Sequence, residues 1–226
     1  AEKSLKNGHP WVFSDEITEV NGRYENGDIV DAFSAKDRYL GSGFINDNSK
    51  IRVRVISRNA NDKFDEAFYK RRLKYAVDYR KTVMGNDFSC CRLIFGEADQ
   101  FPGLTVDRFS DVLSVQIACL GIERIKDMLY RSLLQVLCEY GVNISAIYER
   151  NDLAVRSIEG LSQYKGFYEA EGLKKDLSGH VIITENNIKY DVDYINGQKT
   201  GFFLDQKYNR AAVAKIAKGK TVLDCF

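Results

Sequence analysis

The segment GQKTGFFLDQKYNRAAVAKIAKGKTVLDCF, residues 197–226, joins a glycine-containing run to a helix and then to an apolar stretch. Asp205 is a good N-cap for this helix, and Gly219 is placed to end it. Residues 221–225 then read as a buried strand that carries Asp224 near its carboxyl end. In open parallel sheets, ligands bind beyond the carboxyl ends of the strands. The segment therefore predicts the first strand of an α/β sheet, with an ordinary strand end as the alternative for Asp224.

Two further units precede this segment. Residues 1–60 hold short alternating strands separated by turn residues, a pattern that predicts a small closed β-barrel. Residues 61–178 predict a linker helix and a central α+β domain, with helices over 63–84 and 121–140. Residues 179–226 begin with a hairpin around Asn186-Asn187 and continue into the segment above. The predicted fold class is therefore α/β and multidomain, with the last domain incomplete at Phe226.

Two turns in the central region carry specific expectations. Asn151-Asp152 predicts a hairpin between residues 144–150 and 153–157. Phe101-Pro102-Gly103 predicts a rigid inter-strand turn, which is preferred to the alternative that this turn presents an aromatic ring to a flipped base.

Composition excludes several classes of protein. The chain has 226 residues and a formal net charge of +1, so a case for nucleic acid must come from local patches. No apolar run approaches the length of a membrane span and no signal peptide is visible, which predicts a cytoplasmic protein. The five cysteines lack metal-ligand spacing, so no metal site is expected, and Cys119 and Cys138 are expected to be buried.

Ordered motifs along the chain resemble one enzyme family. They are SLKNGHPWVF (4–13), GEADQFPGLTVDR (96–108), ERND (149–152) with Arg156 and EGL (159–161), and GQKTGFFLDQ (197–206) with Asn209-Arg210. Together they resemble the S-adenosylmethionine-dependent class I methyltransferases that modify cytosine C5 in large-subunit ribosomal RNA and carry an N-terminal PUA domain. The resemblance covers nearly the whole chain. It implies a PUA-like barrel over residues 1–60 and the start of a Rossmann-like domain over residues 179–226.

The resemblance also implies where S-adenosylmethionine binds. Phe203 and Gln206 are the strongest candidates, Gly201 would allow close backbone approach, and Arg210 could pair with the cofactor carboxylate or an RNA phosphate. For each residue the alternative is a helix cap, a core position or a plain helix face. The full predicted cofactor set is Thr200, Gly201, Phe203, Asp205, Gln206, Asn209, Arg210 and Asp224.

Ribosomal RNA is the partner that the resemblance implies, and a homodimer is a further possibility. The predicted RNA contacts lie in the PUA-like part and are Lys3, Lys6, Arg38, Arg52 and Arg54. Arg52 and Arg54 alternate on one strand and suit a pair of phosphate contacts. The helix over 63–84 carries a basic stripe, for which a solvated face is preferred to an RNA contact: Lys70, Arg71, Arg72, Lys74, Arg80 and Lys81.

These observations predict a methyltransferase whose catalytic half is not in this chain. Such enzymes add a cysteine thiolate to cytosine C6 before methyl transfer, and none of the five cysteines matches that position in the family. The 226 residues alone are therefore expected to be inactive and to supply recognition and part of the cofactor wall. A stand-alone PUA-type RNA-binding module and a methyltransferase with a non-RNA substrate are the alternatives.

Overall fold

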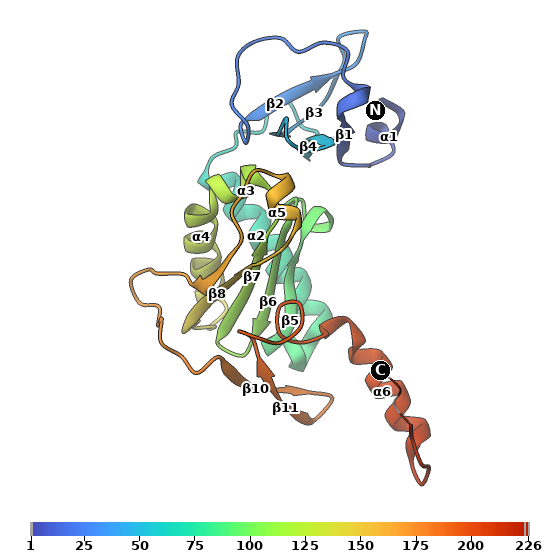
Figure 1. Ribbon diagram of the computed structural model, residues 1–226, viewed down its shortest axis with the longest axis vertical. Helices are drawn as coiled ribbons and strands as arrows, with labels where there is room; N and C mark the ends of the chain where they lie inside the picture. The colour runs from blue at the N-terminus through green and yellow to red at the C-terminus, as the bar shows by residue number, and fades with distance from the viewer. Residues whose placement is uncertain (1, 224, 226) are drawn as a thin grey trace.

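A computed structural model describes residues 2–223 and 225. Its N-terminal unit is a four-stranded antiparallel sheet in the order β1-β4-β3-β2, here called the N-terminal sheet (Figure 1). Leu5, Val12, Ile45, Val53 and Val55 form its small core. The elements are α1 (Glu2–Lys6), β1 (Trp11–Phe13), η1 (Ser14–Glu16), β2 (Ile29–Phe33), β3 (Tyr39–Ile45) and β4 (Ile51–Ser57).

The N-terminal sheet is open at its edges. Each of its three strand pairings contains a register shift, which bends the strands toward one another. Among the described residues, however, no pairing joins the edge strands β1 and β2. A PUA-like sheet is therefore present, and the predicted barrel closure is not confirmed.

The central unit is a five-stranded mixed sheet in the order β5-β6-β7-β8-β9, here called the central sheet, in which only β7 and β8 run parallel. Two long helices, α2 and α4, cover one of its faces and bury a single apolar core with it (Figure 1). The elements are α2 (Glu66–Met84), η2 (Gly85–Ser89), β5 (Cys90–Phe95), η3 (Gly96–Asp99), β6 (Leu104–Phe109), β7 (Val112–Ile117), α3 (Leu120–Arg124), α4 (Lys126–Glu139), β8 (Ala146–Asn151), α5 (Val155–Ile158) and β9 (Tyr164–Phe167).

Two expectations for the central unit are wrong, and one alternative is excluded. The predicted helix over 121–140 is two helices that break at Ile125, a one-residue interruption through which the apolar periodicity continues. The predicted hairpin partner of β8 is the short helix α5, and β8 pairs with β9 instead. Phe101 is fully buried in the core, which excludes the alternative of a base contact and agrees with the preferred prediction of a connecting turn.

The C-terminal unit begins with a hairpin of β10 (His180–Glu185) and β11 (Ile188–Asp193), which packs against one end of the central sheet. Asn186 and Asn187 both have positive φ angles, as the two-residue turn requires, so the predicted hairpin is confirmed. η4 (Leu204–Gln206) and α6 (Lys207–Ala217) follow, and α6 extends away from the rest of the molecule (Figure 1).

The end of the chain departs from the sequence prediction. The helix begins at Lys207, and Asp205 lies in the preceding 3-10 turn, so Asp205 is not its N-cap. Residues 221–223 form no strand, and the side chains of Val222 and Leu223 are exposed. An extended segment needs a neighbouring strand to satisfy its backbone hydrogen bonds, and none of the described strands lies beside it. Asp224 lies outside the described residues.

Candidate functional site

The face of the central sheet opposite α2 and α4, here called the open face, carries buried charge. Asp107 on β6 is fully buried between Leu104 and Phe109, and alternation along the strand turns it away from the helices. Arg92 on β5 donates two hydrogen bonds to the Asp107 carboxylate, at 2.8 and 2.9 Å. The Thr200 hydroxyl donates a third at 2.5 Å. A charged group is thus satisfied in the sheet, and the motif of residues 197–206 is attached to it.

A second buried side chain fixes the same loop. Arg150 on β8 donates from Nη1 to the carbonyl oxygens of Gly197, at 2.9 Å, and Tyr194, at 3.3 Å. Asp107 belongs to the motif of residues 96–108 and Arg150 to that of residues 149–152. Three of the motifs that carry the family resemblance therefore meet at the open face.

Two glycines allow the loop to approach the sheet this closely. A Cβ at Gly197 would lie 2.2 Å from the carbonyl oxygen of Asp193. Gly201 has a φ of +132°, and a Cβ there would lie 2.9 Å from the Cα of Tyr194. The Thr200 side chain beside Gly201 is fully buried. Thr200 and Gly201 of the predicted cofactor set therefore fix the shape of the loop from its buried side.

Four other residues of the predicted cofactor set face outward. Phe203 and Gln206 are half-buried, whereas Asp205 and Asn209 are exposed. Asn209 donates its amide to the side-chain oxygen of Gln206 at 2.7 Å, which fixes the orientation of that side chain. The Lys199 ammonium lies 4.5 Å from the centre of the Phe203 ring. An aromatic face, two amides and a carboxylate thus line one short stretch of surface.

Arg210 is held within the protein. Its guanidinium donates to both carboxylate oxygens of the buried Glu185, at 2.7 and 2.8 Å, and to the carbonyl oxygen of Phe203 at 2.9 Å. It also stacks at 4.4 Å on the Phe202 ring. The hydrogen bonds to Glu185 raise the pKa of Arg210, so its charge is permanent. In this geometry Arg210 supports the backbone of Phe203 and leaves little of its fork for a ligand.

Lys207 is a residue that the sequence analysis missed. It is the first residue of α6, it is buried, and it forms an ion pair with Asp87 of η2. Its carbonyl oxygen accepts a hydrogen bond from Asn186 in the hairpin turn. These contacts fix the start of α6 against η2 of the central unit and against the hairpin of its own unit. A buried lysine in an otherwise solvated helix leaves no signal in the apolar periodicity.

The predicted RNA contacts fall into two groups. Arg52 and Arg54 are engaged: Arg52 donates to Asp47 at 2.8 Å, and Arg54 pairs with Glu159 at 2.9 Å across the junction with the central unit. Lys3 and Arg38 are exposed, and Lys6 is paired with Glu2 near the surface. Lys3 and Arg38 are therefore open to an anionic partner, whereas Lys6 already has Glu2 as its partner. Arg54 is primarily a contact between units.

The cysteines differ from the prediction at one position. Cys90, Cys91 and Cys119 are buried, as expected for Cys119, and burial raises the pKa of the Cys90 and Cys91 thiols to about 12. Cys138 is exposed, because it lies on the side of α4 that faces away from the sheet. Among the described residues, no three metal-binding side chains come together. None of the described helices combines the length and apolar character needed to cross a bilayer.

Comparison with known proteins adds two findings on sequence. Residues 1–58 match the PUA-like domain family. Over the whole chain, the proteins named ribosomal RNA large subunit methyltransferase I are 37% identical in Aliivibrio fischeri, 39% in Aeromonas salmonicida and 40% in Shewanella denitrificans. Each match covers 100% of this chain and 55% of the relative, so the chain spans about half the length of these relatives.

Solved structures support the same fold. A protein of Streptococcus mutans described as a SAM-dependent methyltransferase superposes with a TM-score of 0.75 at 23% identity, over 94% of this chain and 51% of that one. A second structure, described as a methyltransferase complexed with SAH, gives a TM-score of 0.74 at 22% identity over the same shares. At this identity the likeness concerns the fold. The chain is therefore homologous to a part of the ribosomal RNA large-subunit methyltransferases and begins with a PUA-like domain.

Proposed function

We propose that this chain supplies RNA recognition and one wall of the S-adenosylmethionine site in a ribosomal RNA methyltransferase that acts on cytosine C5. The observation that carries the proposal is the meeting of three motifs at Asp107 and Arg150, in a chain that matches such relatives over its whole length. Buried ion pairs often add no stability over apolar packing. Their use to hold this glycine-containing loop therefore supports a functional role for the position of the loop. We also propose that the chain divides into domains of residues 1–60, 61–178 and 179–226.

The division of labour in the cofactor wall follows from burial. Phe203, Asp205, Gln206 and Asn209 face outward and are proposed to contact the cofactor. Thr200, Gly201 and Arg210 are proposed to position them. The outward set fits S-adenosylmethionine chemically, since an aromatic face suits the adenine ring and amides suit polar groups of the methionine part. Asp224 is proposed to contact the cofactor because of its place in the sequence near the carboxyl end of residues 221–225.

Binding of S-adenosylmethionine to the whole protein tests the wall directly. Gln206→Ala removes an oriented amide and is expected to weaken binding about tenfold, the value of one hydrogen bond to a charged or well-oriented group. Tyr208→Ala is the matched control, because its side chain is exposed on the same helix and lies outside the predicted cofactor set. Calorimetric titration in which both variants bind like the parent would contradict the proposed wall.

A stand-alone RNA-binding module is the second candidate, favoured by the PUA-like match of residues 1–58. It predicts RNA binding without any binding of S-adenosylmethionine. The same titration separates the two candidates, because the stand-alone module is expected to bind no S-adenosylmethionine whether or not RNA is present.

A further inference from the structure

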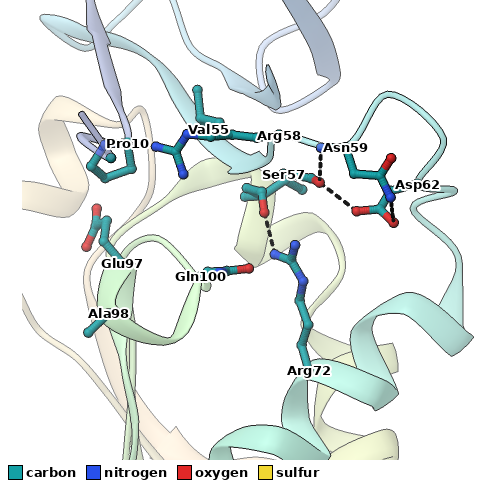
Figure 2. Close-up of a pocket in the computed structure, with 12 residues that line it drawn as sticks. Pro10, Val55, Ser57, Arg58, Asn59, Asp62, Arg72, Glu97, Ala98 and Gln100 are labelled. Carbon is teal, nitrogen blue, oxygen red and sulfur yellow. Dashed lines mark hydrogen bonds between the residues drawn. The ribbon is translucent and has the colours of Figure 1, made fainter. Parts of the chain in front are cut away.

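A cavity of about 670 Å³ lies where the N-terminal sheet meets the central unit (Figure 2). The end of β4 and the loop after it form one side, α2 forms a second, and the turn of η3 forms a third. The polar side chains that line it are Ser57, Arg58, Asn59, Asp62, Arg72, Glu97 and Gln100. None of its lining residues belongs to the predicted cofactor set or to the predicted set of RNA contacts, although Arg54 of the latter set pairs with Glu97 at its edge.

The two carboxylates of the cavity already have partners. Asp62 accepts hydrogen bonds from the Ser57 hydroxyl at 2.6 Å and the Asn59 amide at 3.2 Å, and Arg71 lies 3.8 Å away (Figure 2). Glu97 accepts a hydrogen bond from the Trp11 indole at 2.9 Å and forms an ion pair with Arg54, which does not line the cavity. Each carboxylate therefore has hydrogen-bond donors and one arginine of the protein as partners.

The two guanidinium groups of the cavity are not balanced in this way. Among the described residues, neither Arg58 nor Arg72 has a carboxylate within 4 Å. Arg72 donates to the carbonyl oxygen of Ile56 and stacks at 4.1 Å on the Phe68 ring. Arg58 donates to two carbonyl oxygens of the α1 region, at 3.3 and 3.2 Å. Both forks therefore retain free N–H donors beside the cavity.

Burial makes the Arg72 charge costly. Removal from water lowers the pKa of Arg72 to about 10, and the nearby Asp62 offsets only part of this effect. A partly buried cation without a carboxylate partner gains strongly from a bound anion. The planar fork of arginine can donate to two oxygens of one phosphate at once, so it suits a phosphate group. Gln100 also lines the cavity and brings a neutral amide to it (Figure 2).

The surface next to the cavity favours RNA over a free ion. Tyr75 and Tyr79 follow Arg72 by three and seven residues on α2, so the three side chains share one side of the helix. Both tyrosines are exposed, at 63% and 60%. Exposed aromatic rings near arginine side chains can serve as stacking platforms for bases of single-stranded nucleic acid.

We propose that this cavity binds a backbone phosphate of an RNA strand, held by Arg58, Arg72 and Gln100, with the neighbouring bases on Tyr75 and Tyr79. The inference deepens the proposed RNA recognition and rests on it. It places an RNA contact at the junction of the two units, whereas the predicted contacts lie on the N-terminal unit alone.

Salt-dependent RNA binding tests the inference in the purified protein with a large-subunit ribosomal RNA fragment. Arg72→Gln and Arg58→Gln are each expected to weaken binding about tenfold and to reduce the slope of log affinity against log salt by about 0.7. Arg131→Gln removes the same charge from an exposed site on α4 and is the matched control. Arg72→Lys keeps the charge without the fork, so it is expected to keep most of the slope but not the affinity. Thermal melting of each variant shows that the fold is intact.

The outcomes separate this inference from the proposed function. If the parent binds RNA and both folded cavity variants bind it with the same affinity and slope, the cavity inference is overturned and RNA recognition stands. If the parent binds no RNA, the proposed function fails and the inference with it. The alternative occupant is a free nucleotide or a free phosphate ion. Titration with adenosine monophosphate and with inorganic phosphate, followed by phosphorus NMR, tests whether the cavity binds either of them. If Arg72→Gln loses the binding of phosphate or adenosine monophosphate but keeps the parent's affinity for RNA, the proposal that the cavity binds RNA is also overturned.

Discussion

Asp107 shows how a single residue connects distant parts of the chain. It is buried on β6, is held by Arg92 on the neighbouring strand, and accepts the hydroxyl of Thr200 from 93 residues further along. The sequence places Asp107 and Thr200 in two separate motifs. Only the folded chain shows that the motifs share a hydrogen bond, because spacing along the sequence does not reveal which side chains meet.

Replacement of Thr200 by valine measures this bond. Valine keeps the shape of the side chain and removes the hydroxyl, so a buried carboxylate loses one donor. The free energy of unfolding is expected to fall by about 1.5–3 kcal/mol, the range for hydrogen bonds to charged groups. Denaturation by urea provides the measurement. Thr82→Val is the control, since the Thr82 hydroxyl only bonds to its own helix at an exposed site; an equal loss in both variants would contradict the role of Asp107.

The cysteine thiols provide a test that depends on pH. Burial raises the pKa of Cys90 and Cys91 to about 12 and that of Cys119 to about 11, from an ordinary value of 9.0. These thiols stay neutral in the folded protein while they ionise in the unfolded chain. Their contribution to stability is therefore complete below pH 9 and is lost as the pH rises from 9 toward 12. At pH 8, a thiol reagent is expected to label Cys138 and Cys225 rapidly and the other three only after unfolding; rapid labelling of all five would contradict the burial.

At the scale of elements, the contact between β3 and α3 joins the N-terminal sheet to the central unit. A Cβ at Gly121 of α3 would lie 2.2 Å from ring atoms of Phe44 on β3. Phe44 is buried in the same core as the central helices. Glycine is thus required at this position by close approach, and the apolar core runs continuously through the junction.

Substitution of Gly121 by alanine is expected to destabilise the protein by about 1–3 kcal/mol, because the added methyl group overpacks this contact. Gly166 on β9 is the matched control. A Cβ there has no neighbour within 4 Å, and its φ is not in the left-handed region, so Gly166→Ala is expected to stay within about 0.5 kcal/mol of the parent. Thermal melts that rank the two variants in the opposite order would show that the close contact is absent.

Elements with a local signal could be predicted from the sequence. Alternation and turn residues predicted the β10–β11 hairpin, and the helical period predicted α2 within three residues of its observed start at Glu66. The break at Ile125 and the pairing of β8 with β9 depend on contacts between units, which leave no periodic signal. The strand expected over 221–225 needs a partner strand, and among the described residues it has none.

At the scale of the whole molecule, the junction between units carries more charge than the sequence suggested. Arg54 pairs with Glu159 and Glu97, and Asn46 donates to Glu159 at 2.9 Å. Alternation on β4 showed that Arg52 and Arg54 share a face, but it could not show that the central unit covers part of that face. One predicted RNA contact is therefore mainly structural, and the cavity with Arg58 and Arg72 lies beside it.

Methyl transfer by the whole protein tests the central claim most directly. The protein is incubated with S-adenosylmethionine labelled in its methyl group and with large-subunit ribosomal RNA that lacks base methylation. We expect label in the RNA, recovered after digestion as 5-methylcytidine, and a large loss of label on Gln206→Ala. Efficient transfer to protein or small molecules with none to RNA, or binding of RNA with no affinity for S-adenosylmethionine, would contradict it.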